Sequence, residues 1–186
     1  MTYLAVSSPY RLQRIVSFMH PWSNAYGSGY QLTQSLIAFG RGGWIGVGLG
    51  NSVQKLFYLP EAHTDFIFAV LGEELGLLGE LALLIIYSIF VCRLFVIGQR
   101  ELNAGRLFAA YISKGFAVCL SIQCMINLGV NIGLLPTKGL TLPFISFGGS
   151  SILVNCFIVG ILLRVSHESR SAGKQGHYLN SNKVTE

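Results

Sequence analysis

The sequence predicts an all-α integral membrane protein with three transmembrane helices. Apolar residues make up 52% of the chain and charged residues only 11%, about half the charged fraction of a typical soluble domain. The apolar residues are also clustered, since Lys114 and Lys138 enclose 23 uncharged residues and Lys138 and Arg164 enclose 25 more. As a helix rising about 1.5 Å per residue, either run can cross a hydrocarbon core about 30 Å thick.

Composition and charge exclude several other classes of protein. The net charge is +5, but the basic residues are scattered beside the apolar runs, as topology signals and anionic lipid surfaces require, so no nucleic-acid partner is expected. The cysteines lie in apolar segments and form no CxxC pair, which is typical of small buried thiols that face lipid or other helices rather than of a disulfide or metal site. The four are Cys92, Cys119, Cys124 and Cys156.

Residues 1–64 are predicted to form an extracytoplasmic loop. Prolines and glycines interrupt any period over residues 7–29, which indicates irregular structure. Residues 30–39 carry apolar side chains on one helical face but are too polar to span a membrane. A short helix lying in the membrane interface is therefore expected there.

A glycine-rich segment follows at residues 40–50, with six glycines in eleven residues. A dinucleotide-binding interpretation fails because no βαβ pattern surrounds the segment. Two interpretations remain open. The segment is either a flexible loop or a backbone that lets a bulky ligand approach closely, with Arg41 and Lys55 available to bind phosphate.

Three spanning helices are predicted after the loop, followed by a polar cytoplasmic tail at residues 165–186 that is expected to be disordered. The basic residues gather at the junction of the first two helices and in the tail, and the positive-inside rule makes that side cytoplasmic. The loop then faces outward. The helices are expected at about residues 65–97, 107–134 and 150–164.

Polar side chains mark one face of each of the first two helices. Glu73 and Glu74 lie in the first helix, and intramembrane carboxylates are costly unless they face a bundle interior or a water-filled cavity. Gln123, Asn127 and Asn131 recur every four residues in the second helix and form a polar stripe. This stripe is expected to face other helices.

The segment before the first helix gathers two carboxylates and an imidazole. If Pro60 occupies a first helical turn, Glu61 and Asp65 share one face, whereas if Thr64 caps a helix beginning at Asp65 they need not converge. In both cases Asp65 lies near a helix amino terminus, which favours its ionised form. Such a carboxylate at the membrane surface can take a proton from a sugar hydroxyl, and the alternative is an interfacial helix cap.

The same segment raises the question of a metal ion. Glu61, His63 and Asp65 form a loose pattern with too few nitrogen or sulfur ligands for a structural metal. A hard divalent cation, Mg²⁺ or Mn²⁺, shared with a substrate diphosphate fits better, and the sequence establishes no cofactor. The alternative for His63 is a hydrogen-bonded structural histidine.

Several motifs together resemble the SEDS (shape, elongation, division and sporulation) family, and most closely its cell-division branch, the FtsW proteins. The resemblance covers about residues 9–170 in order. The motifs are Tyr30–Leu36, Gly50–Leu56, Leu59–Ala69, Gly72–Gly76 and Gly133–Ser151.

This resemblance implies a peptidoglycan glycosyltransferase of the bacterial cytoplasmic membrane, which polymerises lipid II at the division septum. The implied partners are lipid II, undecaprenyl diphosphate, a class B penicillin-binding transpeptidase and other membrane proteins of the divisome. Family members have ten spanning helices, so this chain is expected to be a carboxy-terminal fragment with the outer loop and the last three helices. Whether it is active alone stays open.

The resemblance also implies residue roles. Asp65 matches the family's essential aspartate and is expected to deprotonate the N-acetylglucosamine 4-hydroxyl of the acceptor. The candidate substrate-binding residues are Arg41, Lys55, Glu61, His63 and Lys138. The alternative function is a lipid II transporter (a flippase), in which Glu73, Glu74 and the polar stripe would matter more than Asp65. A third reading is a truncated, inactive product.

Overall fold

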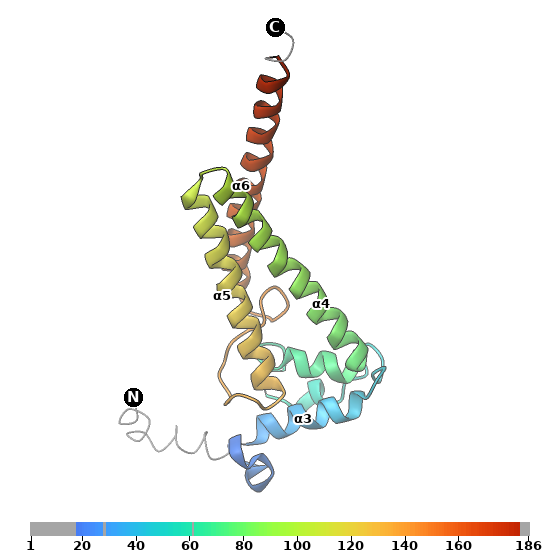
Figure 1. The fold of residues 1–186 in the computed structure, drawn as a ribbon. Helices are drawn as coiled ribbons and strands as arrows, with labels where there is room; N and C mark the ends of the chain where they lie inside the picture. The colour runs from blue at the N-terminus through green and yellow to red at the C-terminus, as the bar shows by residue number, and fades with distance from the viewer. Residues whose placement is uncertain (1–17, 28, 61, 183–186) are drawn as a thin grey trace, which may run out of the picture. The chain divides into compact units, whose positions relative to one another are not determined.

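The computed structural model describes residues 18–27, 29–60 and 62–182, and within these ranges every regular element is a helix (Figure 1). The predictions for residues 1–17, Glu61 and residues 183–186 lie outside the described residues. The elements are η1 (Pro21–Asn24), α3 (Tyr30–Gly42), η2 (Gln54–Tyr58), α4 (Ile67–Asn103), α5 (Leu107–Asn131) and α6 (Gly149–Asn182).

Three helices in the described part of the chain are long and apolar enough to cross a membrane: α4, α5 and the first part of α6, Gly149–Ser169. The predicted fold class, an all-α integral membrane protein with three transmembrane helices, is confirmed. The boundaries differ by a few residues, since α4 begins at Ile67 and continues to Asn103, and α5 ends at Asn131.

The predicted end of the third helix at Arg164 is too early, because α6 continues to Asn182. The expected disordered tail is therefore helical through that residue. Residues 165–182 lack an apolar period, but they contain no proline, and a helix needs no apolar stripe where it is solvated. Arg164 and Glu168 form an i,i+4 ion pair at 2.7 Å on this stretch.

The chain divides into two compact units. The first combines residues 1–86 with 122–149, and the second combines residues 87–121 with 150–186. The core of the first unit draws on α3, the turn before α4, the start of α4 and the end of α5. Its buried members are Ala38, Leu59, Ala62, Phe66, Ala69, Val70 and Val130.

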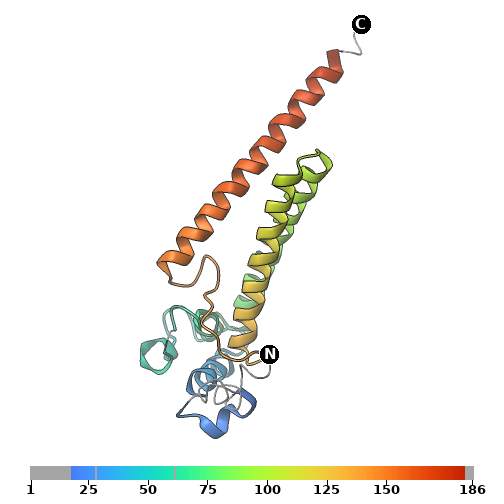
Figure 2. The ribbon, with the colours of Figure 1, turned by 90° about the vertical axis from the view of Figure 1, so that its left-hand side faces the viewer.

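The second unit contains the carboxy-terminal half of α4, the first half of α5 and α6. Figures 1 and 2 show α4 and α5 meeting at a short turn as antiparallel neighbours. Gly98 permits this close packing, because a Cβ there would lie 3.1 Å from the carbonyl oxygen of Ala110. The buried side chains that fill the contact are Leu94, Ala117, Leu120, Ile158 and Leu162.

Candidate functional site

Asp65 lies in the turn that leads into α4, two residues before the helix begins at Ile67. Neither predicted helix start is observed, because residues 62–66 form turns rather than a helix. Its side chain is half-buried. Because Asp65 lies outside the helix, its backbone is held by contacts from elsewhere in the first unit.

Two buried amides from α5 hold the backbone of Asp65. The Nδ2 atom of Asn127 donates to the Asp65 carbonyl oxygen at 2.9 Å, and the Nδ2 atom of Asn131 donates to the same oxygen at 3.0 Å. Asn131 also accepts a hydrogen bond from the backbone N–H of Ala69 at 3.3 Å. The start of α4 is thus fastened to the end of α5.

The same face of α5 holds the connection between α5 and α6. Gln123 donates to the carbonyl oxygen of Thr141 at 3.0 Å, and Asn127 donates to that of Leu140 at 2.5 Å. The polar stripe has the predicted spacing and reaches α4 through Asn131 and Ala69, but the bonds of Gln123 and Asn127 run to backbone carbonyls of turns and loops. The reason is that a loop carries carbonyls with no helical partner, and side-chain amides satisfy them.

The connection between α5 and α6 returns to Asp65. The N–H of Phe147 donates to the carbonyl oxygen of His63 at 2.8 Å. A Cβ on Gly139 would lie 3.0 Å from the Oδ2 atom of Asp65, so the backbone of Gly139 lies directly against this carboxylate. Asp65 therefore faces a stretch of main chain that has no side chain at the point of approach.

A second feature of the first unit is a break inside α4 at Gly76, where φ is 66° and ψ is −169°. A continuous helix would bond the N–H of Leu77 to the carbonyl of Glu73. Here Glu73 accepts from the N–H of Val47 at 3.0 Å, and Leu77 donates to Gly43 at 3.0 Å. The glycine-rich loop replaces the bonds that the break removes.

The bond that a continuous helix would form between Leu78 and Glu74 is replaced in the same way. Gly48 donates to the carbonyl of Glu74 at 3.0 Å, and Leu78 donates to that of Trp44 at 3.2 Å. Gly46 has φ 82°, and a Cβ there would lie 2.7 Å from the backbone nitrogen of Gly76. The glycine-rich segment has a fixed place against α4, and its backbone approaches that helix closely. It is therefore not the flexible loop of the first interpretation, and the approach of a ligand in the second interpretation stays a prediction.

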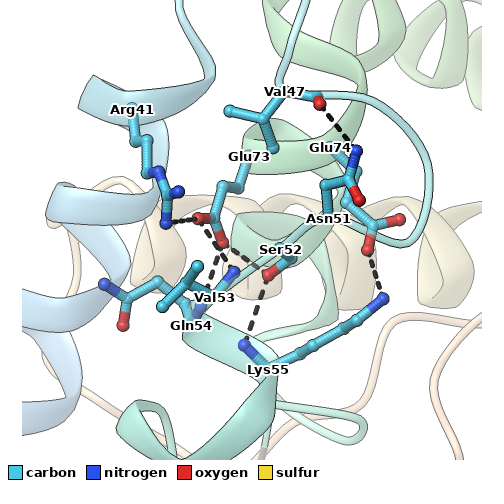
Figure 3. Close-up of polar contacts among 9 residues, drawn as sticks. All are labelled: Arg41, Val47, Asn51, Ser52, Val53, Gln54, Lys55, Glu73 and Glu74. Carbon is cyan, nitrogen blue, oxygen red and sulfur yellow. Dashed lines mark hydrogen bonds and ion pairs between the residues drawn. The ribbon is translucent and has the colours of Figure 1, made fainter.

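The side chain of Glu73 completes this attachment (Figure 3). Its carboxylate is fully buried and accepts hydrogen bonds from the Ser52 hydroxyl and from Nη1 of Arg41 at 3.1 Å. The backbone N–H groups of Val53 and Gln54 donate to it at 3.2 Å each. Four donors around one carboxylate offset much of the cost of burying its charge.

Arg41 and Lys55, the two predicted phosphate ligands, thus have carboxylate partners. Arg41 pairs with Glu73, and Nζ of Lys55 lies 2.6 Å from Oε1 of Glu74. Figure 3 shows both cations turned toward these carboxylates. Their binding of phosphate stays a prediction, while their ion pairs give them a structural role in the loop.

The other predicted site residues are spread around Asp65. His63 is exposed, and Lys138 is exposed beside Gly139, while Glu61 lies outside the described residues. Among the residues that the structure describes, no three His, Cys, Asp or Glu side chains come together to hold a metal ion. Because Glu61 lies outside the described residues, a divalent cation shared with a substrate diphosphate stays a prediction.

A cavity of about 410 Å³ lies elsewhere in the first unit, between α3, the broken segment of α4 and Ile132. Its lining is mainly apolar, and Glu80 is its one charged lining residue. Asp65 does not line it. We therefore place the candidate site at the turn around Asp65 rather than in this cavity.

Sequence reasoning missed Ser52 and Gly139. Ser52 is a buried residue whose hydroxyl binds an intramembrane carboxylate, and no spacing rule links it to Glu73. Gly139 had a weak signal, because a glycine within a proline-bounded connection often allows close backbone approach.

These features define a class of protein. It is a multi-pass membrane protein in which an aspartate, Asp65, is held just before a spanning helix and lies against the connection between α5 and α6. The chain belongs to the FtsW/RodA/SpoVE family of cell cycle proteins, whose family model matches residues 1–171. The resemblance inferred from the motifs is confirmed.

Individual relatives agree. The chain is 61% identical over 168 residues to the probable peptidoglycan glycosyltransferase FtsW of Coxiella burnetii, covering 90% of this chain and 45% of that protein. It is 58% identical over 170 residues to the protein of the same name from Legionella pneumophila, covering 91% of this chain and 43% of that one. The chain spans less than half the length of these relatives.

Two solved structures are similar. One is a peptidoglycan synthase complex described as coordinating polymerization and crosslinking, with TM-score 0.66 and 30% identity over 88% of this chain and 43% of that chain. The other is a mutant of the rod-shape-determining protein RodA from Thermus thermophilus, with TM-score 0.54 and 36% identity over 73% of this chain and 40% of that chain.

Proposed function

We propose that this chain provides the catalytic part of a peptidoglycan glycosyltransferase, which polymerises lipid II into glycan strands during septal wall synthesis. The observation that carries the proposal is the carboxylate of Asp65, held at the start of α4 and facing the bare backbone of Gly139. The names of the curated relatives support the same reaction.

In the proposed reaction, the Asp65 carboxylate takes the proton of the acceptor's N-acetylglucosamine 4-hydroxyl. The oxygen attacks the anomeric carbon of the lipid-linked donor, forming the new glycosidic bond. The bond from that carbon to the diphosphate breaks, and undecaprenyl diphosphate leaves with the electron pair. Asp65 supplies a base held in place before the substrate arrives.

We assign the leaving diphosphate to Lys138. This lysine is exposed and adjoins Gly139, which lies against Asp65. A cation beside the departing oxygens would neutralise the charge that develops as the bond breaks. Arg41 and Lys55 would act at a distance, by fixing the loop through Glu73 and Glu74.

The setting follows from this chemistry. We place the protein in the bacterial cytoplasmic membrane at the division septum, with the loop on the outer side, where lipid-linked precursors are polymerised. The similar synthase complex supports a crosslinking partner, which we take to be a class B penicillin-binding transpeptidase among other divisome proteins.

A lipid II transporter would need Glu73, Glu74 and the stripe from Gln123 to Asn131 to line a path. In the structure these side chains are engaged with the loop, the turn around Asp65 and the α5–α6 connection. No observation favours transport over polymerisation.

The test of the proposed function uses a full-length chimera, in which this chain replaces the matching 168-residue region of the Coxiella burnetii relative. Reconstituted with lipid II, the chimera should form glycan strands, and Asp65→Asn should abolish them while leaving membrane insertion intact. The isolated 186-residue chain is assayed in parallel. Undiminished glycan product from the Asp65→Asn chimera would overturn the assignment.

The proposed orientation has its own test. The test starts from a variant whose four cysteines are replaced. Leu49→Cys then places a single exposed thiol in the loop, and Ala104→Cys places one in the α4–α5 turn, which we expect on the opposite side of the membrane. A membrane-impermeant maleimide added from outside should label position 49 only. Labelling of position 104 before the membrane is opened would reverse the topology.

A further inference from the structure

We propose that Asn127 and Asn131 are positioning residues, which fix the backbone of Asp65 relative to Leu140 and so direct the Asp65 carboxylate toward Gly139. The inference rests on the proposed function and adds to it the side chains that set the geometry of the base. It is carried by five hydrogen bonds of two buried amides, four donated by their Nδ2 atoms and one accepted by Asn131 from the N–H of Ala69.

Asn131 takes the place of a helical hydrogen bond. An uninterrupted α-helix would join the N–H of Ala69 to the carbonyl of Asp65, four residues earlier. Here Nδ2 of Asn131 donates to that carbonyl at 3.0 Å, and its Oδ1 accepts from Ala69 at 3.3 Å. The N–H of Ala69 also bonds the carbonyl of Phe66 at 3.1 Å. A side chain of α5 therefore fixes the position of Asp65 at the entry to α4.

Asn127 joins two backbone segments through a single amide group. Its Nδ2 atom donates to the carbonyl of Asp65 at 2.9 Å and to that of Leu140 at 2.5 Å. Nδ2 of Asn131 donates to the backbone carbonyl of Asn127 at 2.9 Å and to its Oδ1 at 3.3 Å, which links the two residues. The spacing between Asp65 and Leu140 is thus fixed by one NH₂ group.

This spacing matters because Gly139, next to Leu140, lies against the Asp65 carboxylate. If the backbone of Asp65 shifts relative to Leu140, the carboxylate must turn away from its present direction. A misplacement of about 1 Å at a reacting group costs a rate on the order of a hundredfold. The loss falls on the chemical step, because neither asparagine is placed against the substrate.

The test measures kcat and KM for lipid II polymerisation in the full-length chimera. Asn127→Leu and Asn131→Leu should lower kcat about 10- to 100-fold and leave KM within about twofold. Gln123→Met is the matched control, since Gln123 lies on the same face of α5 and binds Thr141 but makes no bond to Asp65. It should keep kcat within about threefold of the parent.

Two further measurements separate positioning from general stability. Melting temperatures in detergent show whether the asparagine variants lose more than the control, and Asn127→Ser and Asn131→Ser replace any leucine variant that does not accumulate. The Asp65→Glu variant combined with Asn131→Leu should lose less than the product of the two single losses, because both act on one carboxylate.

Losses in kcat no greater than that of Gln123→Met, or losses that multiply independently with Asp65→Glu, would overturn the inference. That failure differs from failure of the proposed function. If Asp65→Asn itself keeps full polymerisation, the catalytic assignment falls. If Asp65→Asn is inactive while both asparagine variants keep parental kcat, only the positioning role falls.

Discussion

Glu73 accepts a hydrogen bond from the hydroxyl of Ser52, so a carboxylate inside a spanning helix is bound to the loop that precedes it (Figure 3). The contact lies within the first unit and involves two fully buried side chains. Burying the charge of the Glu73 carboxylate is costly, and this cost is offset because Arg41 and two backbone N–H groups also donate to the carboxylate.

Removal of this carboxylate should destabilise the first unit. Glu73→Ala leaves the Ser52 hydroxyl and two N–H groups without their acceptor, and each buried donor left unpaired costs about 1–3 kcal/mol. A large fall in melting temperature in detergent should follow. Glu74→Gln is the comparison, and it should cost less because its partner Lys55 is partly exposed. Equal melting temperatures for Glu73→Ala and the parent would contradict the prediction.

The break in α4 should depend on glycine at position 76. Gly76→Ala forces a side chain into a left-handed conformation and places a Cβ 2.7 Å from the backbone nitrogen of Ile45, so the loop must move. We expect faster proteolysis of the loop and a lower melting temperature. Gly40→Ala in α3 is the control, since a Cβ there meets nothing within 4 Å. A Gly76→Ala variant as protease-resistant as Gly40→Ala would show that the attachment does not need glycine.

Gly139 should be the most restrictive position beside Asp65. Gly139→Ala places a methyl group 3.0 Å from Oδ2 of Asp65, in space that the proposed acceptor hydroxyl needs. Polymerisation by the chimera should fall about 10-fold or more, on the order expected for a displaced catalytic group, with an unchanged melting temperature. Gly149→Ala, which meets nothing within 4 Å, serves as the control. Parental activity in Gly139→Ala would place the acceptor elsewhere.

The second unit offers a matched pair of ionic contacts. Nε of Arg106 lies 2.6 Å from Oε2 of Glu101, whose side chain is 1% exposed, whereas Arg164 and Glu168 are mostly exposed. Arg106→Lys should lower the melting temperature clearly, because lysine cannot reproduce the planar fork of donors. Arg164→Gln should change it little, since exposed i,i+4 pairs contribute about 0.3–0.5 kcal/mol. Equal shifts in the two variants would contradict the burial argument.

Much of the fold could be predicted from the sequence, because each spanning helix is a local property. The uncharged runs bounded by Lys114, Lys138 and Arg164 reveal hydrophobic length without reference to any partner. The break at Gly76 could not be predicted, since glycine permits a left-handed conformation without requiring it. The backbone of residues 43–48 stabilises the break by supplying the missing hydrogen-bond partners.

The sequence indicates which residues form the candidate site, but it does not indicate which residues they contact. The spacing of Gln123, Asn127 and Asn131 shows that they share a face, but nothing local says that the face meets Asp65 and Leu140. The ion pair between Arg41 and Glu73, which is far along the chain, was not predicted, whereas the expected binding of phosphate by Arg41 stays a prediction. Ion pairing between distant segments depends on the tertiary fold.

The exchange of backbone bonds between the loop and the broken helix also concerns how the chain is made. Synthesis runs from the amino terminus, so residues 43–48 leave the ribosome before Glu73 and Leu78 do. An unpaired backbone group in hydrocarbon costs several kcal/mol, and the interrupted turn exposes four of them. Residues 43–48, which supply the missing hydrogen-bond partners, are therefore already synthesised when the break at Gly76 reaches the bilayer. Insertion of α4 does not depend on a segment that is made later.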